Sequence, residues 1–253
     1  KTSAYFHDQD GFARWLSESG PAFDRVRADA IAQVAAGAQQ LIDAVREANP
    51  EDLRPLAVVL GWLEGPAVEQ AMTRLLGNPA VRGEVVEALA RYGPRVVELV
   101  VEQLDREDLD TRKAAIIALG RIGDARAVPA LTNILADDDE LVVVAAGALA
   151  KIGDRQAFDA LIGLLGHPNA TVRQAAVGAL NSIGHPEMGD RMVTLLADPD
   201  PLIREAAVRI AGYFGYESCR ELLIARTADG DENVRRTAVE HLPYLDDVRV
   251  SAL

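Results

Sequence analysis

Arginine side chains recur along this sequence at intervals of 30 or 31 residues, and their guanidinium groups are its first candidates for chemistry. A row of such groups along one edge could grip an acidic partner or a propionate group through paired N–H donors. The same groups could instead hold carboxylates of their own or the adjacent repeat. We favour this structural interpretation, because one member of the series is a valine and the surrounding pattern continues through it. The series is Arg82, Arg112, Val142, Arg173, Arg204 and Arg235.

Other residue types that support catalysis or metal binding are scattered. Cys219 has Arg220 as its one basic neighbour in sequence, which is too little positive charge to predict an activated thiol. His167 and His185 each precede a proline, so we expect solvated turn residues there. No Cys-rich metal spacing occurs, and no nucleophile is paired with a base. We therefore predict no catalytic residue, no metal site and no cofactor. The four histidines are His7, His167, His185 and His241.

Charge and hydropathy limit the classes of partner. The chain carries 39 acidic and 26 basic residues, a net charge of −13, which opposes unaided binding to nucleic acid or to anionic lipid. The longest uncharged apolar run, residues 141–150, is far shorter than the roughly 20 residues of a membrane-spanning helix. We expect a soluble, cytoplasmic protein whose partner is another protein, one with a basic surface. The oligomeric state stays open.

Acidic residues gather in three short segments, at 105–110, 137–140 and 229–232. Short acidic side chains can accept hydrogen bonds from the free N–H groups at a helix start, and their charge favours that end of the helix. We interpret the three segments as helix caps and solvated turns. A row of carboxylates that attracts a basic protein is the alternative.

The spacing that places these residues is a repeat of two short helices. Four residues before each arginine position lies an Asp or Asn, which predicts a helix start. Apolar residues then recur at i and i+4, as in Ala115 and Leu119, which form one helical face. A glycine column follows, and we expect left-handed backbone at Gly153 and Gly184, where the first helix of each pair ends. A second apolar run, such as 128–135, predicts a second helix.

Such helix pairs cannot bury their apolar faces alone, so they must stack on one another. The sequence predicts an all-α fold, an α-solenoid of about six or seven two-helix repeats of 30–31 residues. Regular repeats cover 78–246 and degenerate ones 22–77, within a solenoid that spans 22–253. We expect residues 1–21, which are rich in aromatic side chains, to form an N-terminal cap or arm. A segment that binds another protein is the alternative.

Two segments carry a resemblance to a known family: HPNATVRQAAVGALNSIG at 167–184 and DPDPLIREAAVRIAGYFG at 198–215. They resemble HEAT repeats, in particular the short prokaryotic type named after phycobilisome lyases. The resemblance implies the architecture and leaves the function open, because this family includes bilin lyase subunits, lyase-like chaperones, scaffolds and modules of enzymes. The paired His-Glu motifs of an iron-binding HEAT enzyme are missing, and the negative charge disfavours the DNA-binding type.

We predict a non-catalytic scaffold or adaptor for protein–protein interaction that uses the concave surface of the solenoid. A subunit of a bilin lyase or chaperone, and a regulatory or assembly module of a larger enzyme, are the alternatives. In this family second helices usually line the concave side, which implies a groove at their polar positions. Tyrosines near the carboxyl end, Tyr213, Tyr216 and Tyr244, could extend this groove, although we favour packing on the final half-repeat for each of them. The implied protein-binding residues are Thr132, Asn133, Asp159, Arg191, Thr194, Tyr213 and Tyr216.

Overall fold

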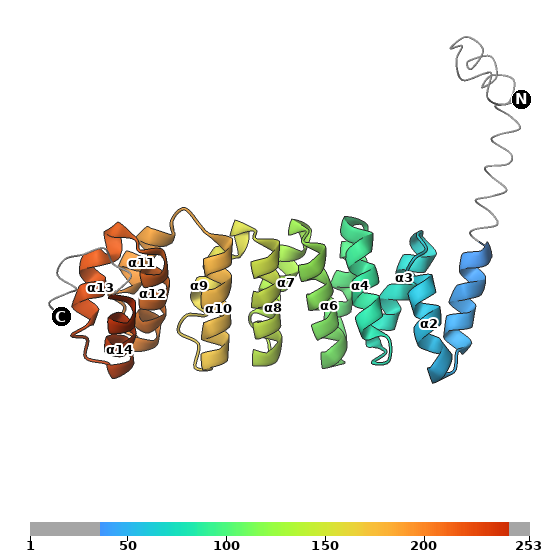
Figure 1. The fold of residues 1–253 in the computed structure, drawn as a ribbon, viewed down its shortest axis with the longest axis horizontal. Coiled ribbons are helices and arrows are strands. Elements are labelled where there is room, and N and C mark those ends of the chain that lie inside the picture. The colour runs from blue at the N-terminus through green and yellow to red at the C-terminus, as the bar shows by residue number, and fades with distance from the viewer. Residues whose placement is uncertain (1–35, 243–253) are drawn as a thin grey trace, which may run out of the picture.

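The computed structural model describes residues 36–242. The predicted cap or arm at 1–21, the start of the degenerate repeats and Tyr244 lie outside the described residues. Within the described part of the chain, every regular element is an α-helix or a short 3-10 helix, and no strand occurs. The all-α prediction is therefore confirmed, and so is the stacked array of helix pairs (Figure 1).

Each repeat contains a longer first helix and a shorter second helix. A helix over residues 36–47 precedes the first of six complete pairs, and α14 follows the last. The first helices are α2 (Pro50–Leu60), α4 (Arg82–Tyr92), α6 (Leu109–Ile122), α8 (Asp139–Ile152), α10 (Ala170–Ile183), α12 (Pro201–Phe214) and α14 (Glu232–His241). The second helices are α3 (Pro66–Arg74), α5 (Val97–Val101), α7 (Val128–Ile134), α9 (Phe158–Gly163), α11 (Met188–Leu195) and α13 (Arg220–Arg226).

Short polar side chains begin most of the first helices, as the sequence predicts. Asp108 accepts a hydrogen bond from the backbone N–H of Thr111 at 2.8 Å, and Asn169 accepts one from that of Thr171 at 2.8 Å. Two positions depart from the prediction. Asp138 flanks α8, but its side chain accepts no capping bond. Asn78 lies in the turn before α4, which begins only at Arg82, so the predicted helix start at Asn78 is wrong. The capping bonds satisfy N–H groups that have no partner inside the helix, which fixes where each helix begins.

Glycines end four of the first helices in left-handed backbone. The φ angles are 72° at Gly153 and 61° at Gly184, so the prediction for these two positions is confirmed. In each case the glycine N–H bonds to the carbonyl four residues upstream, which closes the last turn. Glycine adopts this conformation without the steric cost that a Cβ imposes. The same column therefore turns the chain toward a second helix in each of these repeats.

The hydrophobic core runs through the whole described array. The alanine and leucine columns of the first helices are buried, with Ala115, Ala145 and Leu119 showing no exposed surface to within 1%. These small and branched side chains pack against both the second helix of the pair and the next first helix. A continuous core of this kind makes each repeat depend on its neighbours. No helix among residues 36–242 has the length and apolar character that crossing a bilayer requires.

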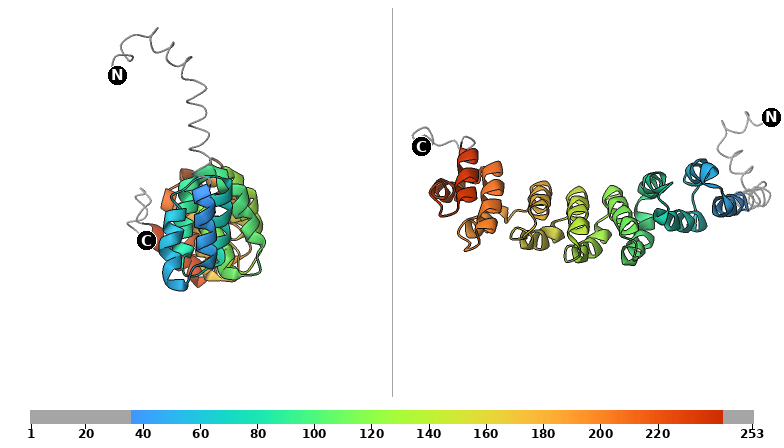
Figure 2. Two further views of the ribbon diagram at one scale, coloured as in Figure 1. Left: turned by 90° about the vertical axis from the view of Figure 1, so that its right-hand side faces the viewer. Right: turned by 90° about the horizontal axis from the view of Figure 1, so that it is seen from below.

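The array forms a shallow arc, and the first helices lie on its inner side (right-hand view of Figure 2). Most neighbouring first helices pack closely against one another, whereas the shorter second helices are spaced further apart. The expectation that second helices line the concave side is therefore wrong for this chain. The physical reason is that the row whose helices approach most closely takes the shorter path around the arc.

Candidate protein-binding face

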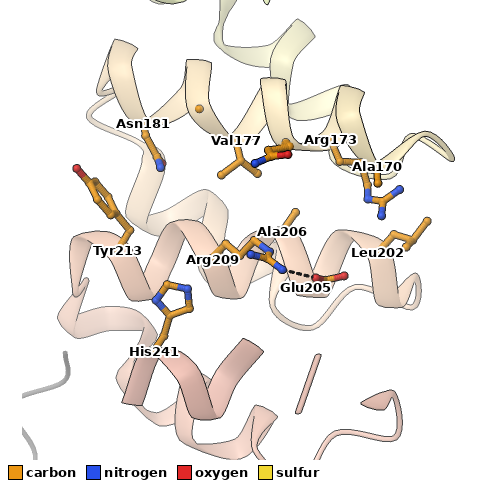
Figure 3. Close-up of a pocket in the computed structure, with 12 residues that line it drawn as sticks. Ala170, Arg173, Val177, Asn181, Leu202, Glu205, Ala206, Arg209, Tyr213 and His241 are labelled. Atoms are coloured by element: carbon orange, nitrogen blue, oxygen red, sulfur yellow. Dashed lines mark hydrogen bonds and ion pairs between the residues drawn. The ribbon is translucent and has the colours of Figure 1, made fainter. Parts of the chain in front are cut away.

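The three largest clefts between first helices lie on the inner side of the arc. The cleft between α4 and α6 has a volume of about 390 Å³, and the one along α6, α8 and α10 has about 380 Å³. The largest of the three, about 530 Å³, separates α10 from α12 (Figure 3). Its lining residues are Ala170, Arg173, Gln174, Val177, Gly178, Asn181, Leu202, Glu205, Ala206, Arg209, Tyr213 and His241.

The cleft between α10 and α12 exists where a column of small residues is interrupted. In α6 the column residue is Gly120, and a Cβ added there would lie 2.8 Å from the Cα of Ala148 in α8. In α12 it is Gly212, where an added Cβ would lie 2.6 Å from His241 of α14. The full column reads Ala90, Gly120, Ala150, Asn181 and Gly212. An asparagine thus stands where other repeats place an alanine or glycine.

The column on the next first helix, which lies opposite these residues, also carries a large side chain at this junction. Opposite the small residues, successive first helices present Ala118, Ala148, Ala179, Ile210 and His241. Every other pair of facing positions contains at least one alanine or glycine, whereas α10 and α12 bring Asn181 and Ile210 to the junction. These two helices accordingly contact each other over a much shorter stretch than α6 and α8 or α12 and α14. From the alignment of the columns, we attribute the cleft to these two larger side chains, which prevent the close approach that Gly120 and Ala148 allow between α6 and α8.

Most polar groups of this cleft already have partners within the protein. The Arg209 guanidinium lies 2.8 Å from a Glu205 carboxylate oxygen one helical turn away. One Arg173 nitrogen donates to the carbonyls of His167 at 2.7 Å and Pro168 at 2.9 Å. The Asn181 amide oxygen is different, because it is buried and accepts no hydrogen bond within the protein.

The two ends of this cleft differ in character. Figure 3 shows Asn181 and Tyr213 at one end, with Arg173 and Leu202 at the other. The Tyr213 ring is 67% exposed and forms an edge-to-face pair with Phe214 at 5.0 Å between ring centroids. Burial, followed by the nearby charge of Arg209, lowers the pKa of His241, so the neutral imidazole is favoured at this wall. The cleft therefore has an apolar floor and an exposed aromatic ring at one end.

The arginine column lies along the turns between repeats and has a structural role. Arg204 forms a buried ion pair with Asp229 of the next repeat, at 2.8 Å. Arg82 reaches Asp110 of its next repeat at 3.3 Å, and Arg112 contacts Asp137 in the turn that follows its own repeat. The structural interpretation is therefore confirmed for these groups.

Several of these arginines also hold the turn that precedes their own helix. In Arg173, Arg204 and Arg235, one guanidinium nitrogen donates to carbonyls six and five residues upstream, at 2.7 to 3.1 Å. Turn carbonyls that no helix satisfies thus gain a charged donor. The hydrogen bonds from Arg204 are the main reason that the pKa of Asp229 falls to about 2.

Comparison of the sequence with models of known protein families identifies the repeat. A model of HEAT repeats matches residues 65–150, 143–201 and 189–253, which is most of the chain. The chain belongs to the HEAT-repeat family. No curated protein matches it.

Solved structures similar to this HEAT-repeat protein include designed and natural arrays. An engineered protein is 22% identical over 85% of this chain and 69% of its own, with a TM-score of 0.44. A designed armadillo repeat protein in complex with the peptide (KR)4 is 20% identical over 70% of this chain and 99% of its own, with a TM-score of 0.42. The complex of CpcE and CpcF of phycocyanin lyase from Nostoc sp. is 27% identical, covering 77% and 76%, with a TM-score of 0.37.

The structure of this HEAT-repeat protein separates the residues that the sequence predicts to bind protein. Five of them, Thr132, Asn133, Asp159, Arg191 and Thr194, lie on the second helices α7, α9 and α11, in the outer row. Arg191 and Asp159 form an exposed ion pair at 3.1 Å that links α11 to α9. Protein binding by these five residues stays a prediction.

The two predicted tyrosines have different surroundings. Tyr213 lines the cleft between α10 and α12. Tyr216 is half-buried, and its ring stacks on Phe214 at 5.3 Å between centroids. Burial raises the pKa of the Tyr216 hydroxyl. Of the two, only Tyr213 lines the cleft, and protein binding by either tyrosine stays a prediction.

The histidines and the cysteine take structural positions in this HEAT-repeat protein. His167 and His185 are half-buried rather than fully solvated, because each ring Nδ1 accepts a backbone N–H two residues ahead, at 3.2 Å. His185 also stacks on Phe158 at 4.1 Å. Cys219 is buried, and burial raises the pKa of its thiol, which disfavours the reactive thiolate. Among residues 36–242, no three His, Cys, Asp or Glu side chains gather in a way that could hold a metal ion.

Sequence reasoning missed Asn181, although a signal for it was present. Aligning the repeats on their arginines places Asn181 in a column that otherwise holds alanine or glycine. A polar residue at a packed position is unfavourable unless it has a partner. The interruption of this column by Asn181 coincides with the junction between α10 and α12, where the cleft lies.

Proposed function

We propose that this HEAT-repeat protein is a non-catalytic scaffold that binds another protein along the inner row of first helices. The observation that carries the proposal is the row of clefts between α4 and α12 on one side of the arc. Solenoids present extended surfaces of this kind to protein partners. The reactive side chains of the described repeats support this proposal, since the buried Cys219 and the capping histidines serve the fold.

The charge distribution supports a partner with two kinds of contact. The clefts along the first helices hold equal numbers of cationic and anionic side chains, namely Arg82, Lys113, Arg121, Arg173 and Arg209 against Glu87, Asp110, Asp139, Glu140 and Glu205. The acidic excess of the chain therefore lies outside them, with concentrations in the turns between repeats. We propose that a basic surface of the partner meets this turn edge, and that association slows as salt screens it.

We further propose that the protein acts in the cytoplasm. The support is its cysteine usage: the single cysteine cannot form a disulfide within the chain, and it is buried. A reducing compartment suits such a protein.

A capture experiment with the full chain as bait tests the scaffold role. Ile117→Arg places a long cation in the cleft between α4 and α6, at a position that is 37% exposed, and we expect loss of captured partner. Asn133→Arg, on an exposed position of α7 in the outer row, is the matched control and should capture normally. The predicted outer-row site is tested separately with Asp159→Lys and Arg191→Glu together.

Three outcomes discriminate between these surfaces. Loss of capture with Ile117→Arg alone assigns binding to the inner row. Loss with the double charge swap alone, or with Asn133→Arg alone, assigns it to the outer row and overturns the proposed face. Turnover of a substrate by the isolated chain, or a visible absorption band after incubation with a bilin, would overturn the scaffold role itself.

A further inference from the structure

We infer that the row formed by Trp62, Arg91, Arg121 and Lys151 binds an extended acidic segment of a partner protein, with carboxylates of that segment meeting Arg91 and Lys151. We call it the helix-end row, because its members lie where α2, α4, α6 and α8 end, at intervals of 29 or 30 residues. The inference rests on the scaffold function proposed above and specifies the chemistry of the partner along one edge of the inner row.

Two cations of the helix-end row have no carboxylate partner. Among the described side chains, exposed Lys151 forms neither an ion pair nor a hydrogen bond, and exposed Arg91 donates to the neutral carbonyl of Gly61 at 3.1 Å. Every other cation on these four helices lies against a carboxylate, so positive charge without a counter-charge is confined to this row. The paired cations are Arg54 with Glu84, Arg82 with Asp110, Arg112 with Asp137, Lys113 with Glu140 and Arg121 with Glu87.

The helix-end row also offers an exposed aromatic ring and hollows on the inner side of the arc. Trp62 is 69% exposed, and with Arg91 it lines a hollow of about 140 Å³ between α2 and α4. The carboxylates of that hollow, Glu84 and Glu87, belong to the ion pairs above. Arg121 lines the next cleft, between α4 and α6. Trp and Arg are the residue types that most often dominate binding energy at protein interfaces.

The spacing of the row fits a short extended peptide. Packed helices lie roughly 8–10 Å apart, so the three intervals from α2 to α8 cover roughly 24–30 Å. An extended chain spans that length in about seven to nine residues. Arg91 and Lys151 are two intervals apart, which corresponds to about five or six residues. A segment with an apolar residue on Trp62 and acidic residues opposite the two cations matches this arrangement.

The opposite edge of the same face favours a protein over nucleic acid. The acidic segments 105–110 and 137–140 lie where α6 and α8 begin, and the helix-end row lies where these helices end. A polynucleotide across the face would meet the acidic edge, and the net charge of −13 opposes it. An acidic peptide confined to the helix-end row avoids that edge. The basic surface of the partner proposed above can then meet the acidic edge at the same time.

Selection from a phage-displayed library of random dodecapeptides tests the inference, with the full chain immobilised as bait. We expect the selected peptides to be rich in Asp and Glu and to share an apolar residue. Their binding should weaken as salt is raised from about 50 to about 300 mM, because the attraction between exposed charges is screened.

Charge reversal at Lys151 tests the cationic contact. Lys151→Glu should weaken binding of the selected peptides at least about tenfold, and Lys151→Arg should retain it. Arg74→Glu is the matched control, since Arg74 is an exposed cation at the end of α3, in the outer row, and forms no ion pair with a described side chain. Cations in the last turn also oppose the partial negative charge of the helix end. Both charge reversals lose that effect, so their thermal denaturation should be similar, while only Lys151→Glu changes binding.

Truncation of the aromatic side chain tests the apolar contact. Trp62→Ala should weaken binding of the same peptides at least about fivefold. Tyr213→Ala is its control: Tyr213 is 67% exposed and occupies the same column two repeats beyond Lys151, so peptides confined to the helix-end row should bind this variant as they bind wild type.

The outcomes separate this inference from the scaffold role. Protein capture lost with Ile117→Arg, together with peptide binding unchanged by Lys151→Glu or Trp62→Ala, would leave the scaffold intact and overturn the helix-end row. Selection of basic peptides alone, selection of no peptide, or an equal loss with Arg74→Glu would overturn it as well. A single-stranded oligo-dT probe that binds wild type more tightly than the peptides do, and is lost with Lys151→Glu, would assign the row to nucleic acid instead. If neither peptides nor captured proteins bind any surface, both proposals fail together.

Discussion

Two junctions of this array differ in how closely neighbouring repeats pack, although the repeats themselves have the same fold. Between α6 and α8, Gly120 lies so close to Ala148 that an added methyl group would collide with its backbone. Between α10 and α12, Asn181 and Ile210 occupy the equivalent columns, and a cleft separates the helices. The four helices themselves have the same length, and each ends at a glycine in left-handed backbone.

The difference teaches that a solenoid can gain a cleft at one junction without altering the repeat. Terminal glycines and buried columns specify the helix pair, and they are present at both junctions. The spacing between pairs is set separately, by the size of the two side chains that face each other. A single substitution in one column therefore changes the surface of the array while its core continues.

The largest expected effect is at the tight junction between the last two described repeats. Asp229 is 2% exposed at its side chain and accepts hydrogen bonds from both Arg204 and Arg226. Asp229→Ala would leave two partly buried cations without their carboxylate, and we expect a loss of about 3–5 kcal/mol in the free energy of unfolding. Chemical denaturation followed by circular dichroism measures it. A loss below 1 kcal/mol would show that this junction does not depend on the ion pair.

The same carboxylate predicts a pH dependence. The pKa of Asp229 is lowered to about 2 in the folded protein, whereas an unfolded aspartate titrates near 3.9. The stabilisation is thus fully present above the unfolded pKa and is lost as pH falls toward 2, by on the order of 2–3 kcal/mol. Denaturation midpoints measured from pH 5 to pH 2 should fall less steeply in Asp229→Asn than in wild type. Parallel curves for the two proteins would contradict this assignment.

An asparagine placed in the tight junction between α6 and α8 should remove the difference in helix spacing between the two junctions. Gly120→Asn introduces a Cβ about 2.8 Å from backbone and side-chain atoms of Ala148, so α6 and α8 must move apart. Overpacking of this kind costs about 1–3 kcal/mol. Gly147→Asn, at a helical position with open space, controls for the change of residue type and should be within about 0.5 kcal/mol of wild type. Equal stability of the two variants would mean that the junction is not closely packed.

The reverse substitution should sharpen the comparison. Asn181→Ala restores the small residue of the column, removes a buried acceptor that lacks a partner and adds a better helix former. We expect the free energy of unfolding to rise by about 1 kcal/mol. Thermal denaturation measures this effect. A destabilised variant would show that the asparagine side chain supports the fold.

The smallest effect belongs to the exposed link between α9 and α11. Arg191 and Asp159 are 47% and 83% exposed at their side chains, so water and salt screen their attraction. A double-mutant cycle with Asp159→Ala and Arg191→Ala should give a coupling energy of about 0.2–1 kcal/mol. A coupling above 2 kcal/mol would mean that the outer row also sets the spacing between repeats.

The sequence predicts those parts of the fold that depend on local chemistry. Asp108 and Asn169 begin helices, and Gly153 and Gly184 end them, because each acts on backbone groups within a few residues. The repeated alanine and leucine columns identify the buried face for the same reason. Local rules of this kind transfer from repeat to repeat without knowledge of the whole array.

The candidate site depends on contacts that the sequence does not state. Which row of helices lies inside the arc is decided by the packing of first helices over many repeats, so Asn133 and Asp159 were assigned to the wrong side of it. The effect of Asn181 on the junction can be predicted only if its column is known to face the next repeat. The alignment of repeats contains that asparagine, but its neighbour across the junction, Ile210, is visible only once the register between helices is known.

The open junction also has a mechanical consequence. Ion pairs join α6 to α8 and α6 to α4, through Lys113 with Glu140 and Arg121 with Glu87. Between described side chains, α8 and α10 lack an ion pair, as do α12 and α14, but these helices pack closely; α10 and α12 have neither an ion pair nor close packing. Bending stiffness in a stacked array is the sum of such contacts between neighbours. A load applied to the two ends would therefore deform this joint first, widening its cleft while the other joints hold. The junction between α10 and α12 is therefore the most compliant one we describe, and tension along the array would act first on the cleft between these two helices.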